Sequence, residues 1–308
     1  MEGEMIAKTN LRILVSFCFF MLMIALIIGC AAKKPFWGDE KTGFILNYRL
    51  APNEVWKYQS ASSQMMNMEQ MGQAIETETN SINHYTIKGK GVDEQKNFLA
   101  TVFIDTMNII AKGMGRENKP DLSPFIGKSF GLTFSSKGKE LELPGADSLT
   151  IDFGMMGGGK QDVKTFFRSI LPDLPSNPVK IGETWTEEDT IKVKQGGMDI
   201  NINMKSTHTL EAMETVDGME CLKITTTSKG TLDGEGQQMG MDLNFEGDLE
   251  GKATWYFAYK KGLFMKSNTE NFMEGTIAAS GPTNMTMPIT QETKAEVKLV
   301  VPAPPSFK

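Results

Sequence analysis

The stretch WYFAYKKGLFM, residues 255–265, contains the pattern that predicts the fold. In its first part every second residue is large and apolar, namely Trp255, Phe257 and Tyr259. The sequence KKG at 260–262 interrupts this pattern, and apolar residues resume after it. A period of two is typical of a strand with one buried face, and a short break with glycine between two such runs is typical of a β-hairpin. The stretch therefore predicts two antiparallel strands joined by a tight turn.

The same alternation extends over most of the chain. Residues 130–143 repeat the hairpin pattern around the turn SKG. Residues 161–171 instead carry apolar side chains at helical spacing, and a proline follows at once. Further strands are expected at 98–104, 198–204, 222–231 and 285–300. We therefore expect a mainly β fold, α+β at most, in which long antiparallel strands form a curved sheet or an open barrel with one or two short helices.

Two parts of the chain carry matching landmarks in the same order. An E-x-W sequence ends at Trp56 and again at Trp185, a Val-Asp turn follows each, and a Lys-Gly hairpin comes later at Gly138 and Gly262. We expect a β-rich domain with duplicated halves and a helical join, at 44–301, with halves 44–150 and 176–301 and the helical segment 161–171. Because Gly, Asp and Lys are common in turns, a chance match stays open as the alternative.

The N-terminus has the organisation of a secretory signal. Lys8 and Arg12 precede an unbroken apolar run at 13–28, which is shorter than the ~20 residues that a membrane-spanning helix needs. The sequence IIGC that ends at Gly29 and Cys30 resembles the bacterial lipobox, with an aliphatic residue at −3 and a small residue before the cysteine. The resemblance implies cleavage between Gly29 and Cys30 and lipidation of the Cys30 thiol. The alternative is an ordinary signal anchor with a chance cysteine.

Lipidation would determine where in the cell the protein is located. Each buried methylene of an acyl chain contributes ~0.8 kcal/mol, so the expected partner of lipidated Cys30 is a membrane. Ala31, rather than an aspartate, follows this cysteine, which implies no retention at the inner membrane. We expect a location in the cell envelope, at the outer membrane facing the periplasm or at the cell surface where two membranes are present. The expected segments are a signal peptide at 1–29, a lipidated tether at 30–43 and a Pro-rich tail at 302–308.

Charge and cysteine content narrow the functional classes. The formal net charge is −6, which argues against nucleic acid as a partner. With Cys18 in the signal and Cys30 used as the anchor, only Cys221 remains, so the mature domain has no intramolecular disulfide. The alternating residues 220–224 around it predict a buried strand thiol.

The sequence carries no pattern that commits it to catalysis. No GxSxG, HExxH or CxxC occurs. Residues 154–160 (GMMGGGK) fit the pattern GxxxxGK of a phosphate-binding loop, but Gln161 stands where that loop needs a hydroxyl. His84 and His208 are expected at half-exposed strand positions, and a hydrolase built on two carboxylates stays open. We expect neither an enzyme nor a cofactor.

Methionines form a conspicuous group in the first half. Met65, Met66, Met68 and Met71 fall close together, and thioethers can bind copper(I), a soft ion. These four residues are the candidates for a metal site. In the alternative reading they line a pliable apolar surface for a lipid or a peptide, or they fill an ordinary core.

The lipobox, the early E-x-W strand and the segment PVKIGETW at 178–185 resemble a group of exported bacterial lipoproteins of uncharacterised function. The likeness covers about residues 44–300. More distantly, the long strands resemble the lipoprotein-carrier superfamily, in which a curved half-barrel sheet cups acyl chains beneath helices. No binding residue carries over, and the scarcity of helix here is a departure. The resemblance implies a membrane-anchored, non-enzymatic β domain that binds a lipid or another apolar ligand. The alternatives are an envelope scaffold or interaction protein without a small ligand, and Met-rich copper binding.

Overall fold

The structure is a computed structural model that describes residues 36–70, 72–152, 160–167, 170–195, 198–238, 240–281 and 284–300. The expected cleavage site at Gly29 and Cys30, the tail 302–308 and most of the segment 154–160 lie outside these residues. Within the described part of the chain, no helix is long and apolar enough to span a membrane.

Strands make up most of the described chain. The first part contains β1 (Gly38–Asp39), β2 (Gly43–Phe44), β3 (Val55–Gln70), β4 (Gln73–Val92), β5 (Phe98–Gly113), β6 (Arg116–Asn118), η1 (Ser123–Phe125), β7 (Ser129–Phe134), β8 (Glu140–Glu142), η2 (Ala146–Ser148), β9 (Thr150–Asp152), β10 (Lys160–Asp162) and α2 (Lys164–Phe167). The second part contains β11 (Thr184–Gln195), β12 (Met198–Val216), β13 (Met219–Gln238), β14 (Met241–Ala258), β15 (Leu263–Ser280) and β16 (Met285–Leu299). The expected hairpins at 130–143 and 255–265 are confirmed as β7–β8 and β14–β15.

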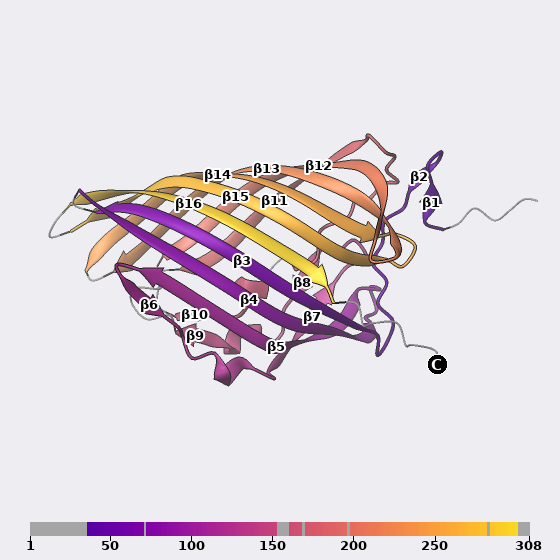
Figure 1. The fold of residues 1–308 in the computed structure, drawn as a ribbon, viewed down its shortest axis with the longest axis horizontal. Coiled ribbons are helices and arrows are strands. Elements are labelled where there is room, and N and C mark those ends of the chain that lie inside the picture. Colours follow the sequence, from indigo (N-terminus) through magenta and orange to yellow (C-terminus); the bar gives the residue numbers. More distant parts are fainter. Residues whose placement is uncertain are drawn as a thin grey trace, which may run out of the picture.

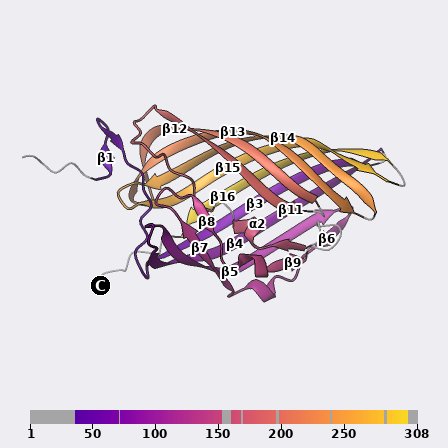
Figure 2. The same ribbon diagram turned by 180° about the vertical axis from the view of Figure 1, so that it is seen from behind.

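Twelve strands form one antiparallel sheet, which confirms the expected fold class. Their order is β11-β12-β13-β14-β15-β16-β3-β4-β5-β7-β8, and β6 pairs with β5 beside this path. The last long strand, β16, therefore lies next to the first, β3, and joins the two parts of the chain into one sheet. The sheet is curved and open, and α2, β9 and β10 lie on its concave side (Figures 1 and 2).

The main core fills one end of the concave side. The extended segment 44–50 buries every second residue there, and it runs between two hairpin turns. The Tyr48 amide donates to the carbonyl of Ser136 at 2.8 Å, and the Arg49 amide donates to the carbonyl of Gly262 at 3.0 Å. The buried Tyr48 hydroxyl donates to the carbonyl of Pro172 at 2.9 Å. Because this one segment bonds to hairpins from both parts of the chain, it locks them around a shared core.

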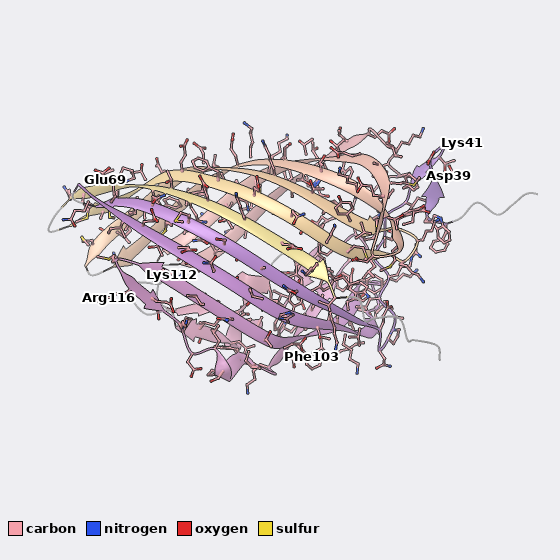
Figure 3. All side chains as sticks on the ribbon, in the orientation of Figure 1. Asp39, Lys41, Glu69, Phe103, Lys112 and Arg116 are labelled. Carbon is pink, nitrogen blue, oxygen red and sulfur yellow. The ribbon has the colours of Figure 1, made fainter. Side chains whose placement is uncertain are left out.

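The two faces of the sheet differ in polarity. The convex face carries charged pairs between neighbouring strands, such as Lys229 with Glu250 at 2.8 Å and Lys205 with Glu188 at 2.9 Å. Figure 3 shows side chains projecting outward along this face and at the strand tips. The concave face is the one on which Tyr85 packs against Phe167 of α2, with ring centroids 5.5 Å apart. An antiparallel sheet commonly shows this division when one face is solvated.

Part of the helical prediction is wrong. Residues 160–162 form strand β10, which pairs with β9. Among the described residues of the expected segment 161–171, only Lys164–Phe167 are helical. The backbone amide of Val163 donates to the carbonyl of Leu149 at 2.7 Å, so the start of the segment is held as a strand. Tertiary pairing outweighs the weak helical preference of a short segment.

Both E-x-W sequences form the same turn. The side chain of Glu54 accepts the amide of Ala51, and the side chain of Glu183 accepts the amide of Lys180, each at 2.8 Å. The duplication of the two halves remains a prediction that agrees with this local likeness.

Candidate functional site

The concave face is divided into three bands along the strands. The first is the aromatic end of the main core, where Trp56, Tyr58 and Trp255 lie. Residues directly opposite each other on neighbouring strands share a face, so the cross-strand register identifies the residues of the other two bands. The polar band comes next along the strands, and the apolar band lies beyond it. The polar band consists of Ser60, Ser62, Gln64, Thr79, Ser81, Asn83, Ser206, Thr226, Ser228, Ser267, Thr269, Asn271 and Thr293.

The apolar band follows the polar one and crosses the sheet from β3 to β11. Its most buried members are Phe245, with 5% of its surface exposed, and Leu243, with 6%. Among the described residues, all that pack together here come from strands of the sheet. We define the apolar band as Met66, Met68, Val193, Met198, Ile200, Ile202, Leu232, Leu243, Phe245, Leu249, Met273, Ile277, Met287 and Ile289.

Glycines on this face explain how the largest apolar side chains become buried against the sheet itself. The ring of Phe245 lies over Gly275, where an added Cβ would come within 2.8 Å of its Cε2. At Gly234 an added Cβ would meet Ile200 at 3.0 Å and Phe245 at 3.4 Å. The large side chains therefore lie flat over glycines of adjacent strands, as aromatic residues do elsewhere over glycines in sheets.

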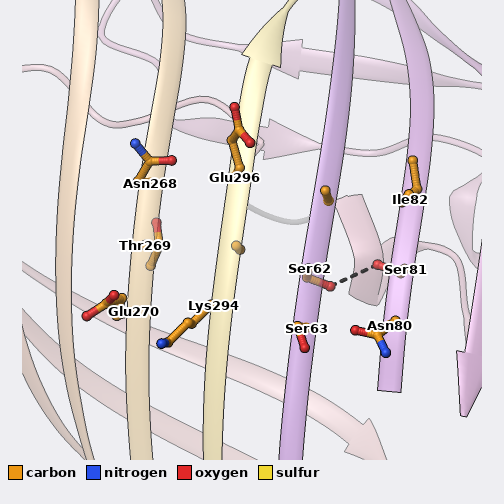
Figure 4. A pocket seen from close by; sticks show the side chains of 12 residues that line it. Ser62, Ser63, Asn80, Ser81, Ile82, Asn268, Thr269, Glu270, Lys294 and Glu296 are labelled. Carbon is orange, nitrogen blue, oxygen red and sulfur yellow. Dashed lines mark hydrogen bonds between the residues drawn. The ribbon is translucent and has the colours of Figure 1, made fainter. Parts of the chain in front are cut away.

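Many polar side chains of the polar band form hydrogen bonds with side chains on neighbouring strands. The hydroxyls of Ser62 and Ser81 are 2.8 Å apart, as are those of Ser206 and Ser228. Gln64 donates to the side chain of Gln291 at 3.2 Å. A hollow of about 650 Å³ lies at mid-length of β15, β16, β3 and β4, where the residues are mostly small or polar (Figure 4). Figure 4 also shows the bond between the two serines of β3 and β4.

A cluster around His208 marks the β11 end of the polar band. The His208 ring stacks on Trp185 with centroids 5.0 Å apart, and its Nδ1 lies 2.8 Å from the Thr226 hydroxyl. The same hydroxyl accepts the indole N–H of Trp255 at 3.0 Å. His208 is only 7% exposed, so its expected half-exposed position is wrong, because the flanking strands and both indoles enclose it. The Nε2 of His208 and the Nε1 of Trp185 are buried without a hydrogen-bond partner among the described residues.

Carboxylates border this cluster. The Nε2 of His208 lies 3.5 Å from a carboxylate oxygen of Glu187, and Asp189 is the next residue of β11 on the same face. Asp173 reaches the same region from the loop after Pro172. Burial and, to a lesser extent, the charges of Glu187 and Asp189 together raise the pKa of Asp173 to about 6.

The four candidate methionines do not come together on one face. Met66 and Met68 belong to the apolar band, whereas Met65 alternates to the convex face, opposite Glu78 and Glu292. Met71 lies outside the described residues, and copper binding remains a prediction. In the described part of the chain, no three His, Cys, Asp or Glu side chains are placed to hold a metal ion.

The remaining singled-out residues occupy separate places. His84 lies on the convex face, where its Nδ1 is 2.8 Å from the Thr106 hydroxyl. Cys221 is fully buried in β13, as expected, and burial raises the pKa of its thiol to about 11. Sequence reasoning missed Asp173 altogether, since its neighbours belong to a strand more than ten residues further along the chain.

Comparison with known protein families gives a match over part of the chain. Residues 155–257 match the model of a family described as a family of unknown function (DUF6263). No curated protein matches the chain.

Several solved structures are similar to this chain at low TM-scores. OccK2 (OpdF) of Pseudomonas aeruginosa is 6% identical over 82% of this chain and all of that chain, with a TM-score of 0.26. A loop-deletion mutant of OmpT, an outer membrane protein of Vibrio cholerae, is 9% identical over 81% of this chain and all of that chain, with a TM-score of 0.22. A DUF1329 family protein from Desulfovibrio piger is 9% identical over 81% of this chain and 88% of that chain, with a TM-score of 0.16. The residues matched by the family model include Trp185, His208 and Trp255, so the cluster lies inside the region shared with that family of unknown function.

Proposed function

We propose that the chain is a non-enzymatic binding module that holds a lipid or another apolar ligand against the concave face of its sheet. The observation that carries the proposal is the apolar band. Among the described residues its packing neighbours all belong to the sheet itself, and most of its members, such as Met66, Ile202 and Leu249, are only half-buried. An apolar sheet face is stable when something covers it. At the aromatic end α2 and its neighbours provide that cover. Over the apolar band, a ligand would provide it.

The side-chain chemistry of the band suits a pliable ligand. Met66, Met68, Met273 and Met287 contribute flexible thioethers, which adapt to ligands of different shape. Acyl or alkyl chains can fill the spaces between such side chains. The opposite face carries charged pairs and is suited to water.

A membrane anchor would bring this face close to a source of amphiphiles. We propose that the chain is cleaved before Cys30 and lipidated there, and that it works in the cell envelope, at the outer membrane facing the periplasm where two membranes exist. Labelling of cells with radioactive palmitate should mark the protein, and Cys30→Ser should abolish the label. An unlabelled wild-type chain would remove the anchor from the proposal.

Extraction of the purified full chain tests the binding function directly. We expect organic solvent to release an amphiphile that mass spectrometry detects. Met273→Asn should lose it, because this change places an amide at a buried position of the apolar band. The matched control is Phe272→Asn on the adjacent convex position, which should retain the amphiphile.

The alternative functions give different results in this experiment. An envelope scaffold without a small ligand would yield no amphiphile from the wild type or from either variant. Circular dichroism and thermal unfolding would establish that Met273→Asn still folds. Met273→Leu keeps an apolar side chain at this position and should therefore retain the amphiphile. Equal amphiphile content in Met273→Asn and Phe272→Asn would contradict the proposed face.

A further inference from the structure

We infer that the carboxylates beside His208 select amphiphiles with a positively charged head group, such as an alkylammonium, whose chain lies on the apolar band. This inference rests on the proposed function and names the class of ligand. It begins from the alternation along β11, where three consecutive concave positions change from charged to apolar. Glu187 and Asp189 are followed on the same face by Ile191.

The register connects the acidic positions with the apolar band. Asp189 lies opposite Met204 of β12, and Ile191 lies opposite Ile202, a member of the apolar band. A chain lying on Ile202 could therefore place its polar end at Asp189 and Glu187 without leaving the face. This is the arrangement that an amphiphile requires.

The buried ring of His208 points into the acidic cluster. Its Nε2 has no hydrogen-bond partner among the described residues and lies 3.5 Å from Glu187. The indole Nε1 of Trp185, stacked on the same ring, is also unpartnered in that part of the chain. Buried polar groups are usually paired. Of these two groups, only His208 can bind an ammonium group, because in the tautomer whose Nδ1–H donates to the Thr226 hydroxyl its Nε2 accepts a hydrogen bond, whereas an indole N–H only donates.

The sign of the charge favours a cation. Asp173, Glu187 and Asp189 supply three carboxylates, against which stand Lys139 and, when protonated, His208. An ammonium group near carboxylates gains charge-assisted hydrogen bonds, and the face of an indole attracts cations. An anionic head group at the same place would meet repulsion.

Photoaffinity labelling of the full chain in phosphatidylcholine nanodiscs tests the inference. Three decyl diazirines of equal length, ending in an ammonium, a hydroxyl or a carboxylate, are titrated, and the crosslinked peptides are identified by mass spectrometry. We expect all three to label peptides of the apolar band, with the ammonium compound labelling at the lowest concentration. Glu187→Gln and Asp189→Asn should each raise the concentration that the ammonium compound requires about fivefold to tenfold and leave the hydroxyl compound unchanged.

The matched control is Glu188→Gln, which removes a carboxylate from the convex face between the two test positions. It should leave all three titrations unchanged. Equal labelling by the three compounds, or the same loss in Glu188→Gln, would overturn the selection of cations and leave the apolar face standing. Labelling of the band by none of the three compounds would overturn the proposed function as well.

Discussion

At the scale of single residues, Asp173 makes the clearest prediction about stability. Its folded pKa of about 6 lies above the ordinary value of 3.8 because burial and two neighbouring carboxylates disfavour its charge. The folded chain therefore binds this proton more tightly than the unfolded chain, and the free energy of unfolding falls as the pH rises from about 4 to about 6. Asp173→Asn should be about 1 to 2 kcal/mol more stable than the wild type at pH 7.5 and equally stable at pH 4 in urea unfolding.

A control of opposite sign is available in Asp121. Hydrogen bonds from Ser123 lower the pKa of this exposed carboxyl, so its contribution to stability is present at neutral pH and is lost as the pH falls through the folded pKa. Asp121→Asn should consequently give no gain in stability at pH 7.5. A wild-type chain as stable as Asp173→Asn at that pH would refute the account of Asp173.

The burial of a residue could be predicted from the sequence where it follows from the alternation of its own strand. Period-two patterns identified Trp255 and Phe257 as core residues, and Cys221 as a buried thiol. Asp173 and the enclosure of His208 could not be predicted, because the groups around them come from other strands. Their environment depends on pairing, which a single strand pattern does not specify.

At the scale of elements, the close approach of β14 and β15 depends on paired glycines. Gly247 of β14 lies opposite Gly275 of β15, and an added Cβ at either position would come within 2.6 Å of a backbone carbonyl oxygen of the neighbouring strand. Gly247→Val should lower the free energy of unfolding by about 2 to 3 kcal/mol, because the strands must move apart. Chemical denaturation would measure this loss.

The control for that change is Gly240→Asn in the turn between β13 and β14. Gly240 has a positive φ of 78° and open space around its Cα, and asparagine tolerates this backbone region. This substitution should cost less than about 1 kcal/mol. A similar loss for both variants would mean that close approach of the strands is not the cause.

Hairpins could be predicted more accurately than the helix. In 255–265 and 130–143 the alternation and the glycine turn agree, so each local signal supports the same structure. In 161–171 the apolar spacing favoured a helix, yet β10 takes part of this segment through its pairing with β9. The partner strand β9 is separated from β10 by a connection, and the sequence pattern does not determine the path of that connection.

At the scale of the whole molecule, the decisive contact joins strands from opposite ends of the chain. The curved antiparallel class followed from the patterns, but the strand order did not. Alternation shows that β3 and β16 each have one apolar face, and it says nothing about their being neighbours. Their pairing makes the apolar band continuous from β3 to β11, and so the candidate site depends on a contact that no local signal contains.

This contact can be tested by crosslinking. Ser63 of β3 lies directly opposite Lys294 of β16, and both side chains are exposed on the convex face. Cα atoms of directly opposed residues lie about 4.5 to 5.5 Å apart, within the range of a disulfide. The double variant Ser63→Cys/Lys294→Cys should oxidise to an intramolecular disulfide that mass spectrometry of digested protein identifies. In Ser63→Cys/Lys252→Cys the second cysteine lies on β14, three strands away or about 14 Å, so no such bond should form in the monomer. Crosslinking of this distant pair with the same yield, or failure of the opposed pair, would separate β3 from β16 and break the continuous face on which both proposals depend.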